Sequence, residues 1–203
     1  MYCKTKRWTA VLVACLLLLF AASAAQAQDS GGRRRGFMLE FGIGTGYITY
    51  GDTADANLAY IQGGGDRINL TLDLALGGAL SQNIYLVGVA EAFATRIFDS
   101  YGNYLQENSY LFGLGLRIYP FHTGLQLGLD AGYAMMNEDQ GGVGYFDYPS
   151  GWGVAASIGW DVSRRATGFS AILGIKANYN SIDYAPVLTE AFAVTAFVDL
   201  IIK

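Results

Sequence analysis

Few residues in this sequence could carry acid–base, nucleophilic or metal chemistry. Its one histidine is His122, which follows Pro120 in a short segment between two apolar stretches. A histidine that acts as a general base must lie within hydrogen-bonding reach of the group that it deprotonates, and the sequence shows no catalytic constellation around this one. No cluster of cysteine and histidine has the spacing of a zinc site. We therefore expect no catalytic residue, no metal and no cofactor, and hence no enzyme.

A glycine-rich segment at residues 42–46 (Gly-Ile-Gly-Thr-Gly) is the second candidate for chemistry. It lacks the spacing of a dinucleotide-binding loop. Its glycines instead alternate with larger residues, and a period of two is typical of a β-strand, whose successive side chains point to opposite faces. We interpret Gly42, Gly44 and Gly46 as small residues on the inner face of a strand.

The elements that could position a site begin after an N-terminal targeting segment. Residues 1–27 combine a basic start, an apolar run from Ala10 to Phe20, and a small-residue cleavage site at Ala25 and Ala27. This is the pattern of a secretory signal peptide. Cleavage would leave a mature chain that starts at Gln28.

Two other interpretations of the N-terminus stay open. Residues 8–25 are nearly long enough for an uncleaved membrane helix, and Cys15 lies in a segment that resembles a lipoprotein acylation box. With cleavage, both cysteines, Cys3 and Cys15, leave with the leader, which suits passage through an oxidising compartment. Residues 28–36, which include an arginine triplet, are expected to form a periplasmic tether.

The rest of the chain is apolar without being helical in pattern. Apolar residues make up 52% of the sequence and charged residues only 15%, whereas soluble domains usually carry about 25% charged residues. Beyond the N-terminus, no apolar run is long enough to cross a membrane as a helix. The length of 203 residues fits one domain, which we place at residues 37–203.

Apolar residues alternate with small or polar ones throughout that domain. In residues 67–77, every even position from 68 to 76 is leucine or isoleucine. Each alternating segment is long enough for the roughly 9–11 residues that a tilted membrane strand needs. The eight segments are residues 37–50, 67–77, 84–98, 109–119, 125–135, 152–162, 169–180 and 190–202. Both faces of 84–98 are small or apolar, so its inward face stays open.

The composition of the two faces decides between a membrane barrel and a soluble, ligand-carrying barrel. A soluble barrel has its apolar face inside and a charged surface. Here the polar faces are mostly Gly, Ala, Ser and Asn, and the apolar faces carry large Leu, Ile, Phe and Trp. Aromatic residues recur near both ends of the strands, as in the girdles of membrane barrels. We expect an all-β fold, an eight-stranded antiparallel up-and-down transmembrane β-barrel.

The connections alternate in length, as in outer-membrane barrels, which have short periplasmic turns and long extracellular loops. The predicted short turns are residues 79–83, 120–124 and 163–168. The predicted long loops are residues 51–66, 99–108, 137–150 and 181–189. His122 then faces the periplasm, whereas the sites of barrel enzymes usually lie at the outer leaflet or cell surface.

Charges separate between the two ends of the predicted barrel. The long loops hold no Lys or Arg but nine acidic residues: Asp52, Asp55, Asp66, Asp99, Glu107, Glu138, Asp139, Asp147 and Asp183. Basic residues lie at the other end: Arg33, Arg34, Arg35, Arg164, Arg165 and Lys203. Loss of the leader removes three basic residues and leaves 10 basic against 17 acidic ones, a net charge of −7. Solvated surface charge explains the acidic loops, and divalent-cation binding is the alternative.

Several charged residues fall on the inner face, where they must be paired or hydrated. These lumen charges are Glu40, Asp73, Glu91, Arg117, Asp130, Lys176 and Asp199, together with Asp161. We expect Arg117 at the depth of Glu40 and Asp199. For Lys176 the candidate partners are Asp73, Glu91 and Asp130. The hypothesis is a plug of ion pairs and waters, and the alternative is a thin charged water path.

In its leader, eight alternating strands, short turns and long acidic loops, the chain resembles the small eight-stranded outer-membrane proteins of the OmpA/OmpX/OmpW-like group over residues 37–203. The resemblance is one of architecture, so no functional residue is carried over. It implies a monomer in the bacterial outer membrane, exported by the secretion translocon and inserted by the outer-membrane assembly machinery. Its partners are then membrane lipid and small solutes or surface ligands, without nucleic acid.

Two functions compete. The barrel is a narrow channel or an OmpW-like transport barrel for small, hydrophobic solutes, or it is a structural or adhesin-like surface-interaction barrel with a plugged lumen and acidic extracellular loops. Of the two, we prefer the transport-related barrel, for which the sequence indicates no substrate.

Overall fold

The computed structural model describes eight stretches of the chain. These are residues 36–50, 67–98, 104–120, 124–140, 143–144, 149–163, 168–184 and 187–203. The predicted signal peptide with its cleavage residues Ala25, Ala27 and Gln28 lies outside the described residues, as do the tether up to residue 35 and His122.

The described residues form eight long strands and one short one. The long strands are β1 (Phe37–Tyr50), β2 (Arg67–Ala79), β3 (Ile84–Phe98), β4 (Tyr104–Ile118), β5 (Leu125–Gln140), β7 (Ser150–Asp161), β8 (Phe169–Tyr184) and β9 (Val187–Ile202). The short strand β6 (Val143–Gly144), absent from the sequence prediction, pairs with the end of β5. None of the described segments is a helix of the length and apolarity needed to cross a membrane.

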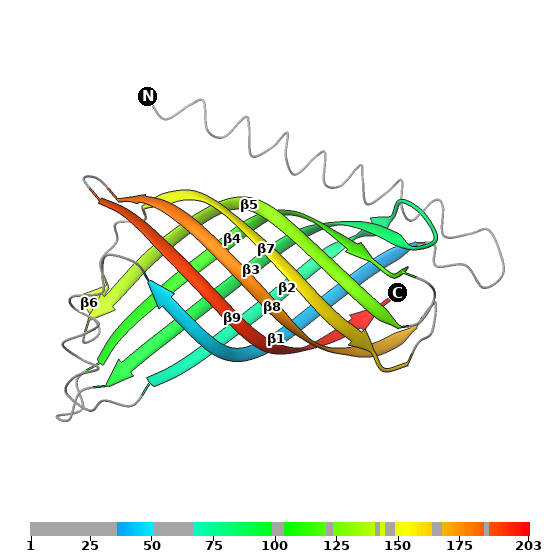
Figure 1. The fold of residues 1–203 in the computed structure, drawn as a ribbon, viewed down its shortest axis with the longest axis horizontal. Helices are drawn as coiled ribbons and strands as arrows, with labels where there is room; N and C mark the ends of the chain where they lie inside the picture. Colours follow the sequence, from blue (N-terminus) through cyan, green and yellow to red (C-terminus); the bar gives the residue numbers. More distant parts are fainter. Residues whose placement is uncertain are drawn as a thin grey trace.

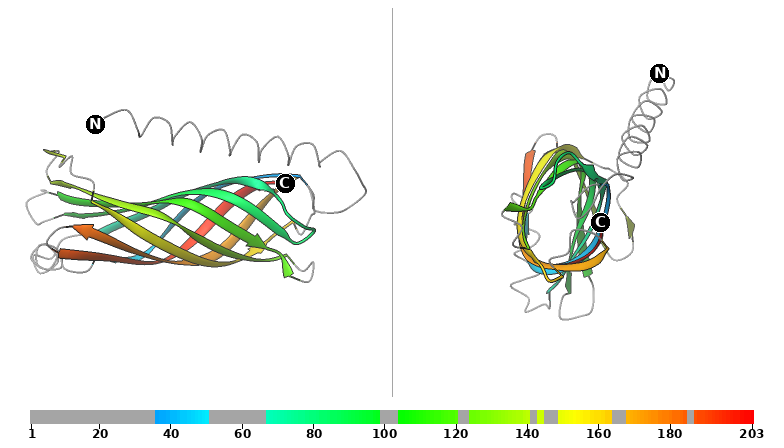
Figure 2. Two further views of the ribbon diagram at one scale, coloured as in Figure 1. Left: turned by 90° about the horizontal axis from the view of Figure 1, so that it is seen from above. Right: turned by 90° about the vertical axis from the view of Figure 1, so that its right-hand side faces the viewer.

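The eight long strands form a closed antiparallel barrel. Each pairs with the long strand before and after it in the chain, and β1 pairs with β9, from Leu39 opposite Ile202 to Tyr50 opposite Ala191. Figure 1 shows the tilted strands wound into one tube, and the end-on view of Figure 2 shows an oval ring. The predicted eight-stranded up-and-down barrel is therefore confirmed. We call the end that holds Phe37 and Ile202 the terminus end and the opposite end the loop end.

The period-two pattern turns large apolar side chains outward. Phe41, Leu114, Trp152 and Ile158 are between 53% and 56% exposed, while their sequence neighbours point into the barrel and are buried or half-buried. The same alternation settles the face of β3 that the sequence left open, because the odd-numbered residues from Tyr85 to Ile97 are the buried ones. The barrel thus carries its apolar belt on the outside.

Several predicted loop boundaries are wrong, because the strands continue past them. Glu107 belongs to β4, Glu138 and Asp139 to β5, and Asp183 to β8. Most of the predicted loop 181–189 is strand, because β8 runs to Tyr184 and β9 starts at its paired partner Val187. The prediction ended the strands where polar residues begin. A ladder of backbone hydrogen bonds, however, can continue in water beyond the apolar belt. The remaining acidic loop residues, Asp52, Asp55, Asp66, Asp99 and Asp147, lie outside the described residues.

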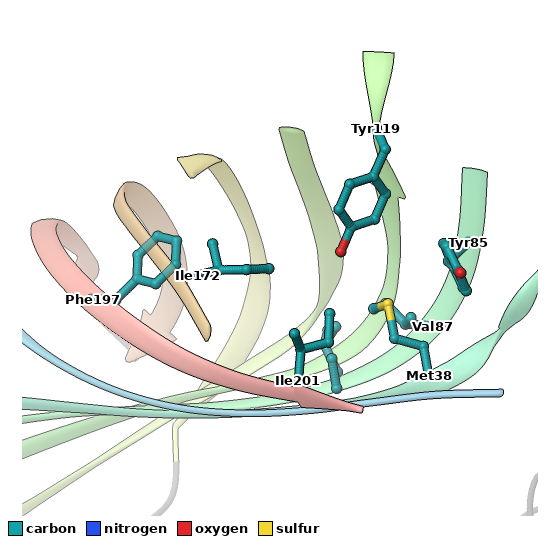
Figure 3. Packing of buried hydrophobic residues seen from close by; sticks show 9 residues of the cluster. Met38, Tyr85, Val87, Tyr119, Ile172, Phe197 and Ile201 are labelled. Carbon is teal, nitrogen blue, oxygen red and sulfur yellow. The ribbon is translucent and has the colours of Figure 1, made fainter. Parts of the chain in front are cut away.

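Two apolar clusters fill the interior at different depths. The first lies toward the terminus end and consists of Met38, Ala75, Tyr85, Val87, Val89, Tyr119, Ile172, Phe197 and Ile201. Figure 3 shows these side chains converging from several strands on the concave face of the sheet. The second lies toward the loop end and consists of Ile48, Phe93, Ala134, Met136, Ile182, Ala191 and Ala193. Buried charged side chains share the interior with them.

Candidate functional site: the charged lumen

The strand register places all seven predicted lumen charges on inward-facing positions. Glu40, Asp73, Glu91, Arg117, Asp130, Lys176 and Asp199 are each at most 5% exposed. Alternation along each strand accounts for this, because every one of these residues lies between two outward-facing neighbours. Charges enclosed in this way need partners within the barrel.

Arg117 forms the first ion cluster, toward the terminus end. Its Nε donates to Glu40 Oε1 at 3.0 Å, and its Nη1 donates to Asp130 Oδ1. Gln126 Nε2 donates to the second oxygen of Glu40 at 3.1 Å and lies 3.0 Å from the hydroxyl of Tyr119. One guanidinium therefore bridges strands on opposite sides of the lumen, since Glu40 lies in β1 and Asp130 in β5.

Lys176 forms the second ion cluster, nearer the loop end. Its Nζ lies 2.9 Å from Asp73 Oδ1 and 2.8 Å from Glu91 Oε1. Asn178 Nδ2 donates to Glu91 Oε2 at 3.3 Å, and the ammonium lies 5.7 Å from the centre of the Phe197 ring. The cluster thus ties β8 to β2 and β3 across the lumen.

The predicted pairing is partly wrong. Arg117 does contact Glu40, but its second partner is Asp130, one of the three candidate partners that were expected for Lys176. Asp199, expected beside Arg117, forms no ion pair among the described side chains, and its Oδ1 accepts no hydrogen bond. The depth of a residue in a barrel depends on the stagger between strands as well as on its position along its own strand, and that stagger cannot be counted from the sequence.

Asp161 and Lys203 close the terminus end. Lys203 Nζ donates to Asp161 Oδ2, and both side chains are fully enclosed. The other Asp161 oxygen accepts hydrogen bonds from Ser170 Oγ and, at 3.0 Å, from Ser163 Oγ. The ammonium also lies 4.9 Å from the centre of the Tyr119 ring. The position of Asp161 in the lumen was predicted from the sequence, but its ion pair with Lys203 was not.

Glycines make room for these charges. A Cβ on Gly42 would overlap Asp199 Oδ1, and a Cβ on Gly115 would overlap Asp130 Oδ1. Both glycines are the register partners of the acidic residues that they accommodate. The glycine-rich segment of β1 is therefore explained by lumen packing, in agreement with its interpretation as small inward-facing residues.

The described side chains suggest an ionic plug rather than a reactive centre. Among the described residues, no three His, Cys, Asp or Glu side chains are arranged to hold a metal ion. The charged groups instead neutralise one another through direct contacts, and a buried charge deprived of its partner is strongly destabilising. The ion clusters and the two apolar clusters together occupy the interior.

The barrel wall is incomplete between β1 and β2 at the loop end. Their ladder stops at Gly44 opposite Thr71, although β1 continues along β9 to Tyr50 and β2 continues along β3 to Arg67. Beyond that point, side chains span the two strands. Thr45 Oγ1 donates to the Asn69 carbonyl at 2.7 Å, and Asn69 Nδ2 donates to the Gly46 carbonyl at 2.6 Å.

A cluster on the outer face at the loop end was missed from the sequence. Arg96 lies 4.7 Å from the centre of the Tyr104 ring, and its Nε donates to Gln106 Oε1 at 2.8 Å. These residues belong to β3 and β4, whose ladder runs to Phe98 opposite Tyr104. The sequence prediction gave Arg96 no role. Its even-numbered position in β3 places it on the outward-facing side of the strand.

Comparison with known proteins gives a match in structure but not in sequence. No protein-family model and no curated protein sequence matches the chain. Neisserial surface protein A (NspA) is similar in structure, with a TM-score of 0.53 over 82% of this chain and 96% of that chain at 11% sequence identity.

Two further solved structures are similar at lower scores. Ail, the attachment invasion locus protein of Yersinia pestis, in complex with the heparin analogue sucrose octasulfate, has a TM-score of 0.46 and 10% identity over 80% of this chain and 97% of that chain. The outer membrane protein OprG from Pseudomonas aeruginosa has a TM-score of 0.43 and 12% identity over 85% and 99% of the two chains. At these identities, the comparisons concern fold alone.

Proposed function

We propose that the chain is an integral protein of the bacterial outer membrane whose lumen is closed to diffusing solutes, and that its loop end serves as an interaction surface. The proposal starts from the closed eight-stranded barrel, which is similar in fold to small outer-membrane β-barrels. The observation that carries this proposal is the filled interior. The Lys203–Asp161 pair, the two apolar clusters and the two ion clusters all lie inside the barrel.

The outer face supports the membrane location. Leucine, isoleucine, phenylalanine and tryptophan side chains cover it as a continuous belt, and a belt of this kind suits lipid rather than water. As partners we propose membrane lipid, the export and assembly machinery, and a ligand outside the cell, with no catalytic role and a monomeric barrel.

The loop end supports a surface role. The β4–β5 ladder continues to Leu105 opposite Gln140, past the last β5–β7 pair at Met135 and Ser150. The paired strands β4 and β5 therefore extend past the start of β7, and the adjacent pair β3 and β4 carries the Arg96–Tyr104 stack on its outer face. NspA, the match with the higher structural score, is by its name also a surface protein.

Conductance tests the closed lumen. We expect the purified barrel to show no stable openings in a planar lipid bilayer, because buried apolar and charged side chains crowd the interior. Liposomes that contain the barrel should likewise retain a small encapsulated solute. Stable single-channel openings of the wild-type protein, altered by Arg117→Ala, would show instead that the ion clusters line a conducting path.

The unpaired edges of β1 and β2 favour a second candidate function, the lateral passage of a small hydrophobic solute. Gly46 is exposed although it lies on the inner face of β1, so the wall is thin where the ladder ends at Gly44. A solute could enter there without crossing the plugged axis of the barrel.

A staple across this gap tests the lateral route. Thr45→Cys combined with Leu70→Cys places two outward-facing thiols on the separated strands, next to the last β1–β2 pair. If solutes pass laterally, oxidation should reduce uptake of a hydrophobic dye by liposomes, and reduction should restore it. The single cysteine variants are the controls. Equal uptake in the oxidised and reduced double variant excludes passage at this gap.

A further inference from the structure

The charges in the central layer of the barrel do not balance. Five carboxylates face this layer, from Glu40, Asp73, Glu91, Asp130 and Asp199, against the two cations of Arg117 and Lys176. The ion pairs use the carboxylates of Glu40, Asp130, Asp73 and Glu91 and leave Asp199 with none. A buried carboxylate without a counter-charge is costly, so this layer lacks positive charge.

Two buried oxygens without a hydrogen-bond partner among the described residues lie over alternate glycines on the inner face of β1. Asp199 Oδ1 lies against Gly42, where a Cβ would otherwise stand, and Asp73 lies on the other side of the same glycine. Two residues further along, Thr71 Oγ1 lies against Gly44 in the same way. Both Asp199 Oδ1 and Thr71 Oγ1 are buried and accept or donate no hydrogen bond among the described side chains.

The Thr71 hydroxyl is evidence independent of the acidic residues. It carries no charge, it is 1% exposed, and its oxygen is left without a partner beside the same glycine segment that receives Asp199. Native structures rarely leave buried polar groups unsatisfied unless water or an ion completes them. Carboxylate and hydroxyl oxygens are ligands of the kind that hard cations take.

We propose that the niche at Gly42 and Gly44 binds one alkali-metal cation of the size of Na⁺, with Asp199 and Thr71 as ligands next to Asp73. A monovalent ion suits the site because one carboxylate, that of Asp199, forms no ion pair among the described side chains. The ion supplies positive charge to the layer that Arg117 and Lys176 leave incompletely neutralised. This site goes beyond the proposed function, because a barrel that conducts nothing can still hold the ion.

Equilibrium dialysis of the purified barrel against radioactive sodium, in a choline chloride background, tests the proposal directly. The wild-type protein should bind about one Na⁺ per barrel in a saturable manner. Asp199→Asn should lose this binding and Thr71→Val should weaken it. Asp183→Asn, the same change at an exposed residue of β8, should bind as the wild type does. Heat-modifiable migration on a gel establishes that each variant is folded.

The heat-unfolding midpoint gives a second readout. At equal ionic strength, NaCl should raise the wild-type midpoint above that in choline chloride by several degrees, because an ion that binds only the folded state stabilises it. Asp199→Asn should show no such difference, and in choline chloride it should be at least as stable as the wild type.

Three outcomes would overturn the proposal. The first is an absence of saturable sodium binding by the wild-type barrel, and the second is undiminished binding by folded Asp199→Asn. The third is a wild-type midpoint that rises on acidification to the same extent in both salts, which would show that protons neutralise the layer.

Discussion

Replacement of Arg117 by methionine is expected to lower the free energy of unfolding by about 3–5 kcal/mol. The guanidinium contacts Glu40 and Asp130, and all three side chains are at most 5% exposed. Methionine keeps much of the volume but leaves two carboxylates buried without a counter-charge. Urea-induced unfolding in lipid vesicles, followed by tryptophan fluorescence, measures the change.

Two controls separate lost charge pairing from lost packing. Arg96→Met removes an arginine from the exposed face of β3 and should cost at most about 1 kcal/mol, as exposed pairs do. Combining Arg117→Met with Glu40→Gln and Asp130→Asn removes the whole charge cluster and should recover most of the lost stability. A loss below about 1 kcal/mol for Arg117→Met alone would contradict a role for this cluster in holding the barrel together.

Leu72→Arg is expected to lower the stability of the bilayer-inserted protein by about 2–4 kcal/mol. Leu72 lies near the middle of β2 and its side chain is 41% exposed on the outer face. In a bilayer this position faces hydrocarbon, and burying a guanidinium there is costly. In a soluble barrel the same change would place a charge in water at almost no cost. Urea titration of the inserted protein, compared with the wild type, measures the difference.

Ile68→Arg is the matched control for this substitution. Ile68 lies on the same face of the same strand, close to its loop end, and is 59% exposed. Near the membrane interface the cost should fall to about 0–1 kcal/mol. Equal stability of Leu72→Arg and the wild type, together with partitioning of the protein into the aqueous phase of a detergent separation, would refute the membrane location.

Most of the fold was predictable because a strand has a period of two. The row of leucines that starts at Ile68 could only be one face of a strand, and the poverty of charge opposite it indicated an enclosed interior. The strand ends were predicted wrongly where the two faces of a strand no longer differ in polarity. Glu107 and Asp183 look like loop residues but extend strands past the apolar belt, because backbone pairing there does not depend on lipid-facing side chains.

In the charged lumen, too, the face of a residue was predictable from the sequence but its contacts were not. The pattern of alternation sufficed to assign Lys176 and Asp199 to the interior, but it could not say which cation meets which acid. Sequence distance is no guide, since the contact between Arg117 and Glu40 joins residues 77 positions apart. The stagger of neighbouring strands sets these depths, and it exists only in the closed sheet.

The sequence by itself thus determined which side chains of a strand share a face, because that depends only on local backbone geometry. The tertiary structure alone decided the two ion clusters, the clasp of Lys203 on Asp161 and the free carboxylate of Asp199. It also decided that the β1–β2 ladder ends at Gly44 while its neighbours continue. These features depend on strand stagger and barrel closure, which arise from contacts between residues far apart in the chain.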